Sequence, residues 1–460
     1  MTCRHRPNCK IRRSDCRNAS ALTGVCLALC IVASLASAQE APSTPEGYIE
    51  LGLGQTDNLN RNADELQSDI GRLAVGFAGR TDRRRLRGAV VGDIEYRKYG
   101  AEELLDDDDE VLGSIDGVLE LHAVPDRVQW DFRVGYGQVR IDAFGPVGPS
   151  NRQSTTSFST GPQIALPLGQ RTLLQVGGMI GGQSFEVTRE LDGRSTAVRL
   201  GLERQIDSVT QLTLALEGRE IEYDLDAQIH DIATLSLEYR RELASGEAFA
   251  SIGRGRVEIN NEDAEPVTVG RLVWKRAVGA RSRIEICAGR EITDAGSAFA
   301  GAGVAIGCPG DLSGLASAAR RTDNREQGTV STTNPFVRAG GSLSFQVDSA
   351  LGNFRATFSM AQDRFEEDTT YDNDSTILEV SGSRDFAHHW RAELTARLWV
   401  QDFIDLGEKN EDQFVRLSLS RLLARNMRLT LSFEQNRRVG GVRPYDANDY
   451  FLSIGRDFGR

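Results

Sequence analysis

Charged side chains recur at alternate positions in several short segments of this 460-residue chain. The sets contain Asp93, Glu95 and Arg97, Glu217 and Arg219, and Arg391, Glu393 and Arg397. In a β-strand, residues two positions apart point to the same face, so each set would form one charged face. Such a face could select solutes by charge, or it could consist of ion pairs that fill a polar interior together with water. Both interpretations stay open, and pairing is expected in either case because unpaired charges would be costly.

Other groups that could carry chemistry give weaker patterns. The acidic segment 102–110 could bind Ca²⁺ through oxygen ligands, but it lacks the glycine and the spacing of an EF-hand loop, which favours a solvated acidic loop. His388 and His389 have no cysteine or carboxylate at metal-ligand spacing. His122 and His230 fall near opposite ends of their segments, and no Gly-x-Ser-x-Gly element occurs. We therefore predict no catalytic residue, no metal site and no cofactor.

Cysteine usage separates the first 38 residues from the rest of the chain. Five of the seven cysteines fall in that segment, which leaves Cys287 and Cys308 beyond it. In an oxidising compartment these two residues could form a disulfide. Two free thiols are the alternative.

The first 38 residues read as a signal peptide that is cleaved during export. Basic residues between Arg4 and Arg17 precede an apolar stretch over 21–35, which ends in Ala36-Ser37-Ala38, a pattern that signal peptidases cut. The apolar stretch is shorter than the ~20 residues that a transmembrane helix needs. Cleavage would change the formal net charge from −12 to −17, because six basic residues and Asp15 are removed. An exported acidic protein is a poor candidate for nucleic-acid binding, so we predict no nucleic-acid partner.

The rest of the chain alternates apolar and polar residues in short segments, from Gly47 to the last ten residues. In segment 427–438, for example, Leu429 and Leu431 alternate with Arg428 and Thr430. This period is expected of strands with one apolar face. The pattern continues over roughly 400 residues without a domain linker, which is more than the core of one soluble β-sandwich holds.

The connections between these segments alternate in length. Short turns fall at 81–85, 168–171 and 424–426, and longer polar loops fall at 141–153, 404–412 and 439–448. Outer-membrane barrels have short periplasmic turns and long outer loops. The sequence therefore predicts an all-β fold, a transmembrane up-and-down antiparallel β-barrel over residues 39–460. It would have about 18–22 strands, with about 20 as the best value.

Segment 293–334 decides the strand number. It is either one long outer loop, which we favour, or two further strands, and as a loop it could also fold inward as a plug. The tryptophans give an independent check on the topology. Trp130, Trp274 and Trp390 would lie beside short turns on the apolar face, where an interfacial aromatic belt belongs. Trp399 falls on the polar face and does not fit this belt.

Three short motifs resemble those of a known family. The first strand ends in Gly54-Gln55-Thr56-Asp57-Asn58-Leu59, Ser68-Asp69 opens the second, and Asn334-Pro335-Phe336 opens a strand after the long segment. This pattern resembles the β-barrel porin-2 family and related outer-membrane proteins associated with exopolysaccharide and exosortase gene clusters. The resemblance implies location in a bacterial outer membrane, with lipid and the barrel insertion machinery as partners. It also suggests polysaccharide or envelope export proteins as partners. The chain departs from most such barrels because two residues follow Phe458, the aromatic residue that would be read during insertion.

Three functions follow as hypotheses. The first is a porin-like channel linked to exopolysaccharide export. The second is a non-conducting structural or docking barrel of a polysaccharide assembly in the cell envelope. The third, a barrel hydrolase, is disfavoured because no nucleophile and base are apparent at one rim.

Overall fold

The computed structural model describes residues 46–459, apart from the segment 295–331 and several short gaps. The gaps are 63–64, 101–108, 143, 146–147, 149–150, 225–227, 261, 264–265, 366–367, 387–388 and 442. The predicted signal peptide lies outside the described residues, as does most of the acidic segment 102–110. No helix in the described part of the chain is long and apolar enough to cross a membrane.

Almost all regular structure in the described residues is β-strand, as the period of two predicts. The strands are β1 (Glu46–Thr56), β2 (Ser68–Arg83), β3 (Leu86–Tyr99), β4 (Asp109–Val124), β5 (Val128–Arg140), β6 (Arg152–Pro167), β7 (Thr172–Phe185), β8 (Gly193–Gln205), β9 (Thr210–Tyr223), β10 (Ile229–Leu243), β11 (Gly246–Ile259), β12 (Glu262–Asp263), β13 (Val267–Gly279), β14 (Ser282–Thr293), β15 (Phe336–Ser349), β16 (Gly352–Phe365), β17 (Asn373–Phe386), β18 (Trp390–Phe403), β19 (Glu408–Ala424), β20 (Met427–Gly440) and β21 (Tyr445–Phe458). Two single-turn 3₁₀ helices, η2 (Arg189–Leu191) and η3 (Thr369–Tyr371), lie in connections.

The strands form one closed antiparallel ring, because β1 pairs with β21 along most of its length, from Gly47 opposite Phe458 to Thr56 opposite Asp449. The two-residue β12 pairs only with β11, and β11 pairs directly with β13, so β12 is not a wall strand. The wall therefore contains 20 strands, which confirms the predicted fold class and the predicted number.

The strands on either side of segment 295–331 are direct neighbours. Thr293 of β14 lies opposite Phe336 of β15, and their ladder continues to Ser282 opposite Val347. Reading segment 293–334 as two further wall strands is therefore wrong. Whether its central part forms a plug concerns residues outside those described.

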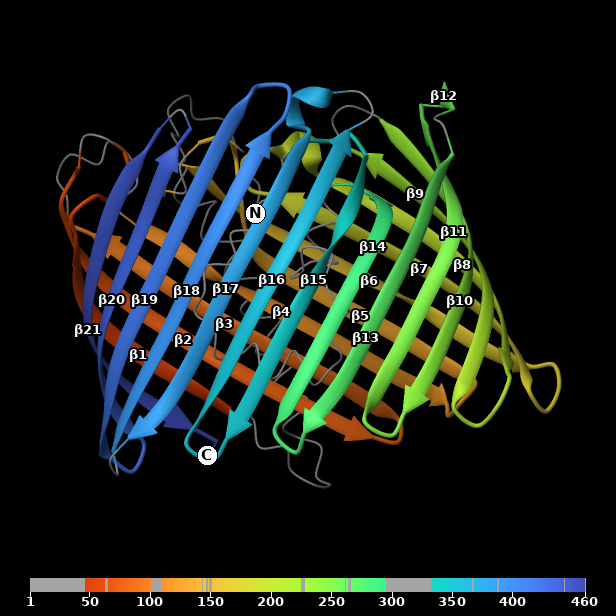
Figure 1. Ribbon diagram of the computed structural model, residues 1–460, viewed down its shortest axis with the longest axis horizontal. Helices are drawn as coiled ribbons and strands as arrows, with labels where there is room; N and C mark the ends of the chain where they lie inside the picture. The colour runs from red at the N-terminus through yellow and green to blue at the C-terminus, as the bar shows by residue number, and fades with distance from the viewer. Residues whose placement is uncertain are drawn as a thin grey trace, which may run out of the picture.

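Connections alternate between the two ends of the barrel around the ring, and the longest of them all lie at one end (Figure 1). We call the end whose connections have two to four residues the turn end, and the other end, whose connections have four residues or more, the loop end. The C-terminus lies at the turn end, at the bottom of Figure 1. Two loops are shorter than predicted: β19 begins at Glu408, so residues 408–412 extend the wall, and only residues 441–444 of the predicted loop 439–448 lie between β20 and β21. The polar character of residues 408–412 did not prevent them from continuing the ladder, since Glu408 pairs with Phe403 of β18.

The barrel has an apolar exterior and a polar interior. Large apolar side chains on alternate positions are exposed on the outer face, and Leu53 and Ile252 reach 75 % and 64 % exposure. The intervening positions carry buried charged side chains such as Glu95 and Arg438. In a soluble protein this exposed apolar area would have to be covered, whereas a lipid bilayer accepts it.

The predicted aromatic belt has the expected placement. Trp130 and Trp390 lie next to short turns on the outer face, and Trp274 lies opposite Ile286, which is also exposed there. Trp390 packs under the guanidinium of Arg421, at 5.4 Å from the ring centre.

Candidate functional site in the barrel lumen

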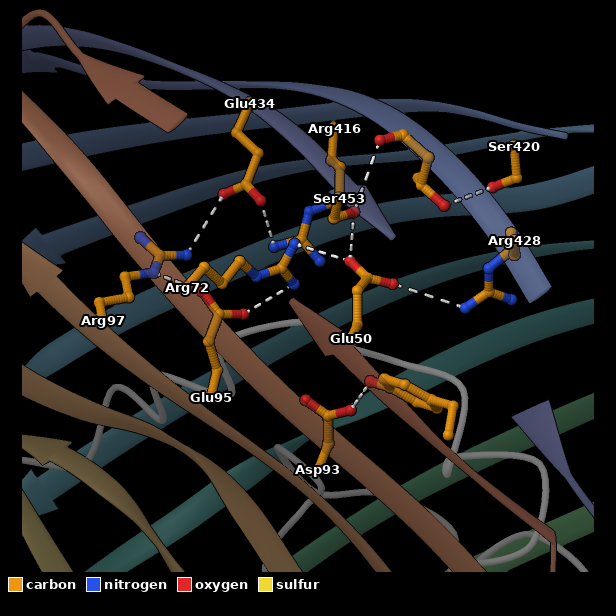
Figure 2. A network of polar contacts seen from close by, with 12 residues as sticks. Glu50, Arg72, Asp93, Glu95, Arg97, Arg416, Ser420, Arg428, Glu434 and Ser453 are labelled. Atoms are coloured by element: carbon orange, nitrogen blue, oxygen red, sulfur yellow. Dashed lines mark hydrogen bonds and ion pairs between the residues drawn. The ribbon is translucent and has the colours of Figure 1, made fainter. Parts of the chain in front are cut away.

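The strands that close the ring carry a connected set of buried charges on their inner face (Figure 2). We call this set the closure network, and its members are Glu50, Arg72, Glu95, Arg97, Arg416, Arg428 and Glu434. They come from β1, β2, β3, β19 and β20, where alternate positions point into the lumen.

Arg72 is the centre of the closure network. One of its Nη atoms lies 3.2 Å from Glu50 Oε1 and the other lies 2.8 Å from Glu95 Oε2. Glu95 also accepts a bond from Arg97 Nε at 2.5 Å. Two guanidinium groups therefore share one carboxylate, which compensates charges that have been removed from water.

The second half of the network crosses the closure. Glu434 lies 2.6 Å from Arg416 and 4.0 Å from Arg97. Because three strands lie between β3 and β20 in the ring, this contact spans part of the lumen rather than joining wall neighbours. The network thus ties together strands from the two ends of the sequence.

Aromatic and hydroxyl groups complete this wall. The guanidiniums of Arg72 and Arg97 lie 5.3 and 5.2 Å from the ring centre of Phe451, close enough for cation–π attraction. Ser453 Oγ donates to Glu50 at 2.7 Å, and Arg428 approaches the same carboxylate at 3.6 Å.

Asp93 lies beside this network but bonds elsewhere. The phenol of Tyr48 donates to its carboxylate, which links β1 to β3. Towards the turn end, a cavity of about 140 Å³ is bordered by the network and by a row of hydroxyl groups. The hydroxyls belong to Ser418, Ser420, Thr430 and Ser432. This part of the lumen is hydrophilic and has space for water or a small solute.

The charges singled out from the sequence fall into separate parts of the lumen. Asp93, Glu95 and Arg97 lie together at the closure. Arg391 and Glu393 pair at 2.7 Å nearer the turn end, where they line the same cavity as the closure network. On these strands pairing is found, and whether the same charges also select solutes stays a prediction.

The remaining predicted charges lie farther round the wall. Glu217 pairs with Arg199 at 3.3 Å, and Arg219 pairs with Asp294 at 3.1 Å. Arg397 lies over the ring of Phe414, at 5.8 Å from its centre. The sequence did not single out Glu50, Arg72, Arg416, Arg428 or Glu434, although the same alternation places them inward.

A second feature lies at the loop end, where the wall departs from a regular barrel. The ladder between β4 and β5 runs from Val124 opposite Val128 to Ile115 opposite Tyr136 and stops there. β4 continues to Asp109 paired with β3, and β5 continues to Arg140 paired with β6. We call residues 137–140 and 152–157 the hairpin tip, since they form a ladder that has separated from β4.

The hairpin tip reaches across the lumen. The Arg140 guanidinium lies 4.4 Å from the ring centre of Trp399, and its Nη2 donates to Gln401 Oε1 at 3.3 Å. Both partners are buried on β18. Counted the shorter way round the ring, seven strands separate β5 from β18: β4, β3, β2, β1, β21, β20 and β19. This contact explains Trp399, the tryptophan on the polar face, as part of a bridge inside the barrel.

The loop that follows β5 is held at the same place by Arg438. This side chain has no exposed surface and forms a fork with Asp412, with contacts of 2.7 and 2.8 Å. Its Nη1 also donates to the carbonyl oxygens of Phe144 and Gly145 at 3.2 and 2.8 Å. A buried guanidinium with four such contacts holds the loop rigidly in the opening of the lumen at the loop end, which we call the mouth.

Aromatic rings cover this junction. The ring of Phe144 lies 4.7 Å from that of Phe403 and stacks on Tyr371 of η3 at 5.9 Å. Phe336 and Phe365 complete the cluster. Desolvation raises the pKa of the Tyr371 phenol, and the nearby Asp368 and Asp142 raise it further. The mouth is therefore narrowed by this aromatic cluster, which covers the buried polar contacts of Arg438.

The remaining candidates are cysteines and histidines. Cys287 is buried on β14 and takes part in a disulfide. Its predicted partner, Cys308, lies outside the described residues, so that pairing stays a prediction. His230 is buried next to the ring of Tyr223, and within the described ranges no cluster of three His, Cys, Asp or Glu side chains could hold a metal.

No protein-family model and no curated protein matches the chain. Among solved structures, the siderophore receptor PirA from Acinetobacter baumannii is 8 % identical, with a TM-score of 0.44 and coverage of 91 % of this chain and 81 % of that one. PirA from Pseudomonas aeruginosa is 10 % identical, with a TM-score of 0.41 and the same coverage of the two chains. OccK1 (OpdK) from Pseudomonas aeruginosa is 12 % identical, with a TM-score of 0.33 and coverage of 90 % of this chain and 99 % of that one. All are outer-membrane β-barrels, and the chain is similar to them as a barrel.

Proposed function

We propose that this chain is an outer-membrane barrel that lets small hydrophilic solutes pass through a narrowed lumen. The observation that supports it best is the reversal of polarity, with exposed leucines outside and buried charges and hydroxyls inside. A bilayer accepts the first surface, and the second suits water and polar solutes. Export through the cleaved signal 1–38 and assembly by the barrel insertion machinery belong to the same proposal.

Conductance of the purified protein in a planar bilayer tests this function. We expect defined single-channel steps that are small for a ring of this size, because Arg140, Trp399 and Arg438 narrow the mouth. The variant Trp399→Ala should enlarge the steps, since it removes the ring on which Arg140 rests. Trp390→Ala is the control, because that ring lies on the outer face. An absence of steps in all three proteins would refute the channel.

A non-conducting docking barrel is the second candidate, and the bridge from Arg140 to β18 favours it, since a transport pore gains nothing from a filled mouth. A link to exopolysaccharide export is supported only by the motifs around Asp57-Asn58 and Pro335-Phe336. Acidic and neutral oligosaccharides added to one side of the bilayer test that link. Transient blockades of the current would support it, and undisturbed current would count against it.

A further inference from the structure

A groove of about 570 Å³ crosses the outer face of the wall over strands β16 to β20, in the cyan-to-blue part of Figure 1. Its floor is formed by Gly382 of β17 and Ala392 of β18, where the outward-facing side chains are small. Gly382 pairs with Phe354 on one side and Leu394 on the other, and both of these side chains are exposed on the outer face. The groove therefore faces the surroundings of the barrel rather than its lumen.

Apolar side chains border the groove on both sides. Phe354 lies on one side, and the other side is formed by Leu394, Leu417, Leu419 and Leu431. The exposure of these five side chains runs from 38 % to 57 %. Apolar surface is more stable in contact with hydrocarbon than with water. In the wall of a membrane barrel that hydrocarbon is supplied by the acyl chains of lipid.

The groove carries positive charge where it approaches the turn end. Arg384 borders it there, is exposed, and forms no ion pair or hydrogen bond with any residue that the structure describes. Arg421 of β19 is also exposed, and it packs on the ring of Trp390 without a carboxylate partner in the described ranges. Every arginine of the closure network, by contrast, has a carboxylate partner. These two outward cations are therefore available to an anion from outside the protein.

The two guanidinium groups can converge on one anion. Only β18 separates their strands, so the backbones at Arg384 and Arg421 lie about 10 Å apart across the sheet. Along the strands they are offset by two residues, since Arg384 pairs with Ala392 and Arg421 pairs with Trp390. Two arginine side chains that extend toward each other cover this separation, and a phosphate group accepts hydrogen bonds from more than one guanidinium.

The level of these arginines in the bilayer matches that of a lipid headgroup. Trp390 belongs to the aromatic belt, and the rings of such belts lie at the level of the headgroups. From Arg384 the groove passes Gly382 and Val380, away from the turn end and toward the middle of the wall. A phosphate at the arginines and an acyl chain along the groove would follow each other in the order in which a phospholipid joins them.

We propose that the groove binds one anionic phospholipid, with its phosphate between Arg384 and Arg421 and one acyl chain over Gly382 and Ala392. A headgroup with a net negative charge fits best, because the two cations have no carboxylate to neutralise them. The site lies on the outer face of the wall, so it does not depend on the passage of solutes through the lumen. The lipid site and the channel can therefore be tested separately.

Native mass spectrometry of the barrel in detergent, titrated with phosphatidylglycerol, measures the affinity of the site. Phosphatidylcholine is the comparison lipid, because its headgroup has no net charge. The double variant Arg384→Gln with Arg421→Gln removes both cations. The matched control is Arg204→Gln with Arg276→Gln, which removes two exposed outward arginines near the turn end of β8 and β13, away from the groove. Tryptophan fluorescence verifies the fold of each variant before the titration.

A second variant tests the groove without changing any charge. Ala392→Leu places a large side chain on the floor of the groove, where the acyl chain would lie. Its control is Ala233→Leu, the same change at an exposed outward position of β10. Both substitutions exchange one apolar side chain for another on the face that contacts lipid, so we expect both variants to fold.

We expect the unmodified barrel to retain one phosphatidylglycerol at least about tenfold more tightly than phosphatidylcholine. A basic residue close to an anionic headgroup changes the affinity about fivefold, so the double variant at Arg384 and Arg421 should bind phosphatidylglycerol at least about tenfold more weakly. Ala392→Leu should weaken it as well, and both controls should leave it unchanged. Equal affinity for the two lipids, or an equal loss in the control that lacks Arg204 and Arg276, would overturn the anionic site. Unchanged binding by Ala392→Leu would overturn the role of the groove.

Discussion

At the scale of single residues, the lumen shows how charge can be buried without being isolated. Each carboxylate of the closure network faces more than one donor: Glu50 meets Arg72, Arg428 and Ser453. Removing one charged side chain from such a set leaves the opposite charge of its partners buried and uncompensated. The resulting loss in the free energy of unfolding is larger than the stabilisation that the ion pair itself contributed. The consequence is that the guanidiniums at the closure are not interchangeable with those near the turn end, where water supplies the missing contacts.

Substitution of Arg72 by Met should therefore destabilise the barrel strongly. Glu50 would lose its closest cation and Glu95 one of its two guanidinium partners, and we expect a loss of about 3–5 kcal/mol in the free energy of unfolding. Denaturant titration of the protein in detergent, followed by tryptophan fluorescence, measures it. Arg391→Met is the matched control: its pair with Glu393 is partly exposed, so we expect a loss of at most about 1 kcal/mol. Equal losses of unfolding free energy in the two variants would show that burial of the ion pair does not determine how much it stabilises the barrel.

At the scale of elements, the alternation of residue types predicted most of the wall, but it did not predict that the end of β5 leaves the wall. The period of two placed Leu429 and Leu431 outside and Arg428 and Thr430 inside, because that signal is local to one strand. It also placed Arg140 on the outer face of β5, whereas the strand leaves the wall and carries Arg140 to β18. Contacts between β5 and β18 depend on how all the strands of the ring are arranged in space. The alternation of residues within one strand carries no information about that arrangement. Trp399 was the one visible sign, as a tryptophan on the wrong face.

The loop after β5 should be released when its anchor is removed. Arg438→Gln loses the fork to Asp412 and the bonds to the carbonyls of Phe144 and Gly145. Hydrogen bonds to a charged group contribute about 1.5–3 kcal/mol, so local opening should become at least about tenfold more frequent. Chymotrypsin cleavage after Phe144 in the folded barrel reports that opening. Arg437→Gln is the control one residue away, because its side chain is half exposed and points outward. Similar cleavage rates in the two variants would show that Arg438 is not the anchor.

At the scale of the whole molecule, the two ends of the barrel differ in what they can do. The turn end has connections too short to fold inward, and its described cavity is lined by charges and hydroxyls. The loop end carries the hairpin tip, the Arg438 anchor and the aromatic cluster around Phe403. In the proposed channel, control over passage would therefore act from the loop end. In an outer membrane this end would face outward, since outer-membrane barrels expose their longer connections.

That orientation can be tested with single cysteines at the two ends. Leu406 lies in the exposed connection between β18 and β19 at the loop end, and Arg425 lies in the exposed turn between β19 and β20. A membrane-impermeant maleimide added to intact cells should label Leu406→Cys, and should label Arg425→Cys only after the outer membrane has been permeabilised. Native Cys287 is buried and disulfide-bonded, so it contributes no background. The two positions flank the same strand, so differences in expression or folding would affect both alike. Labelling of Arg425→Cys alone in intact cells would invert the barrel, and the narrowed mouth would then control passage from the periplasm.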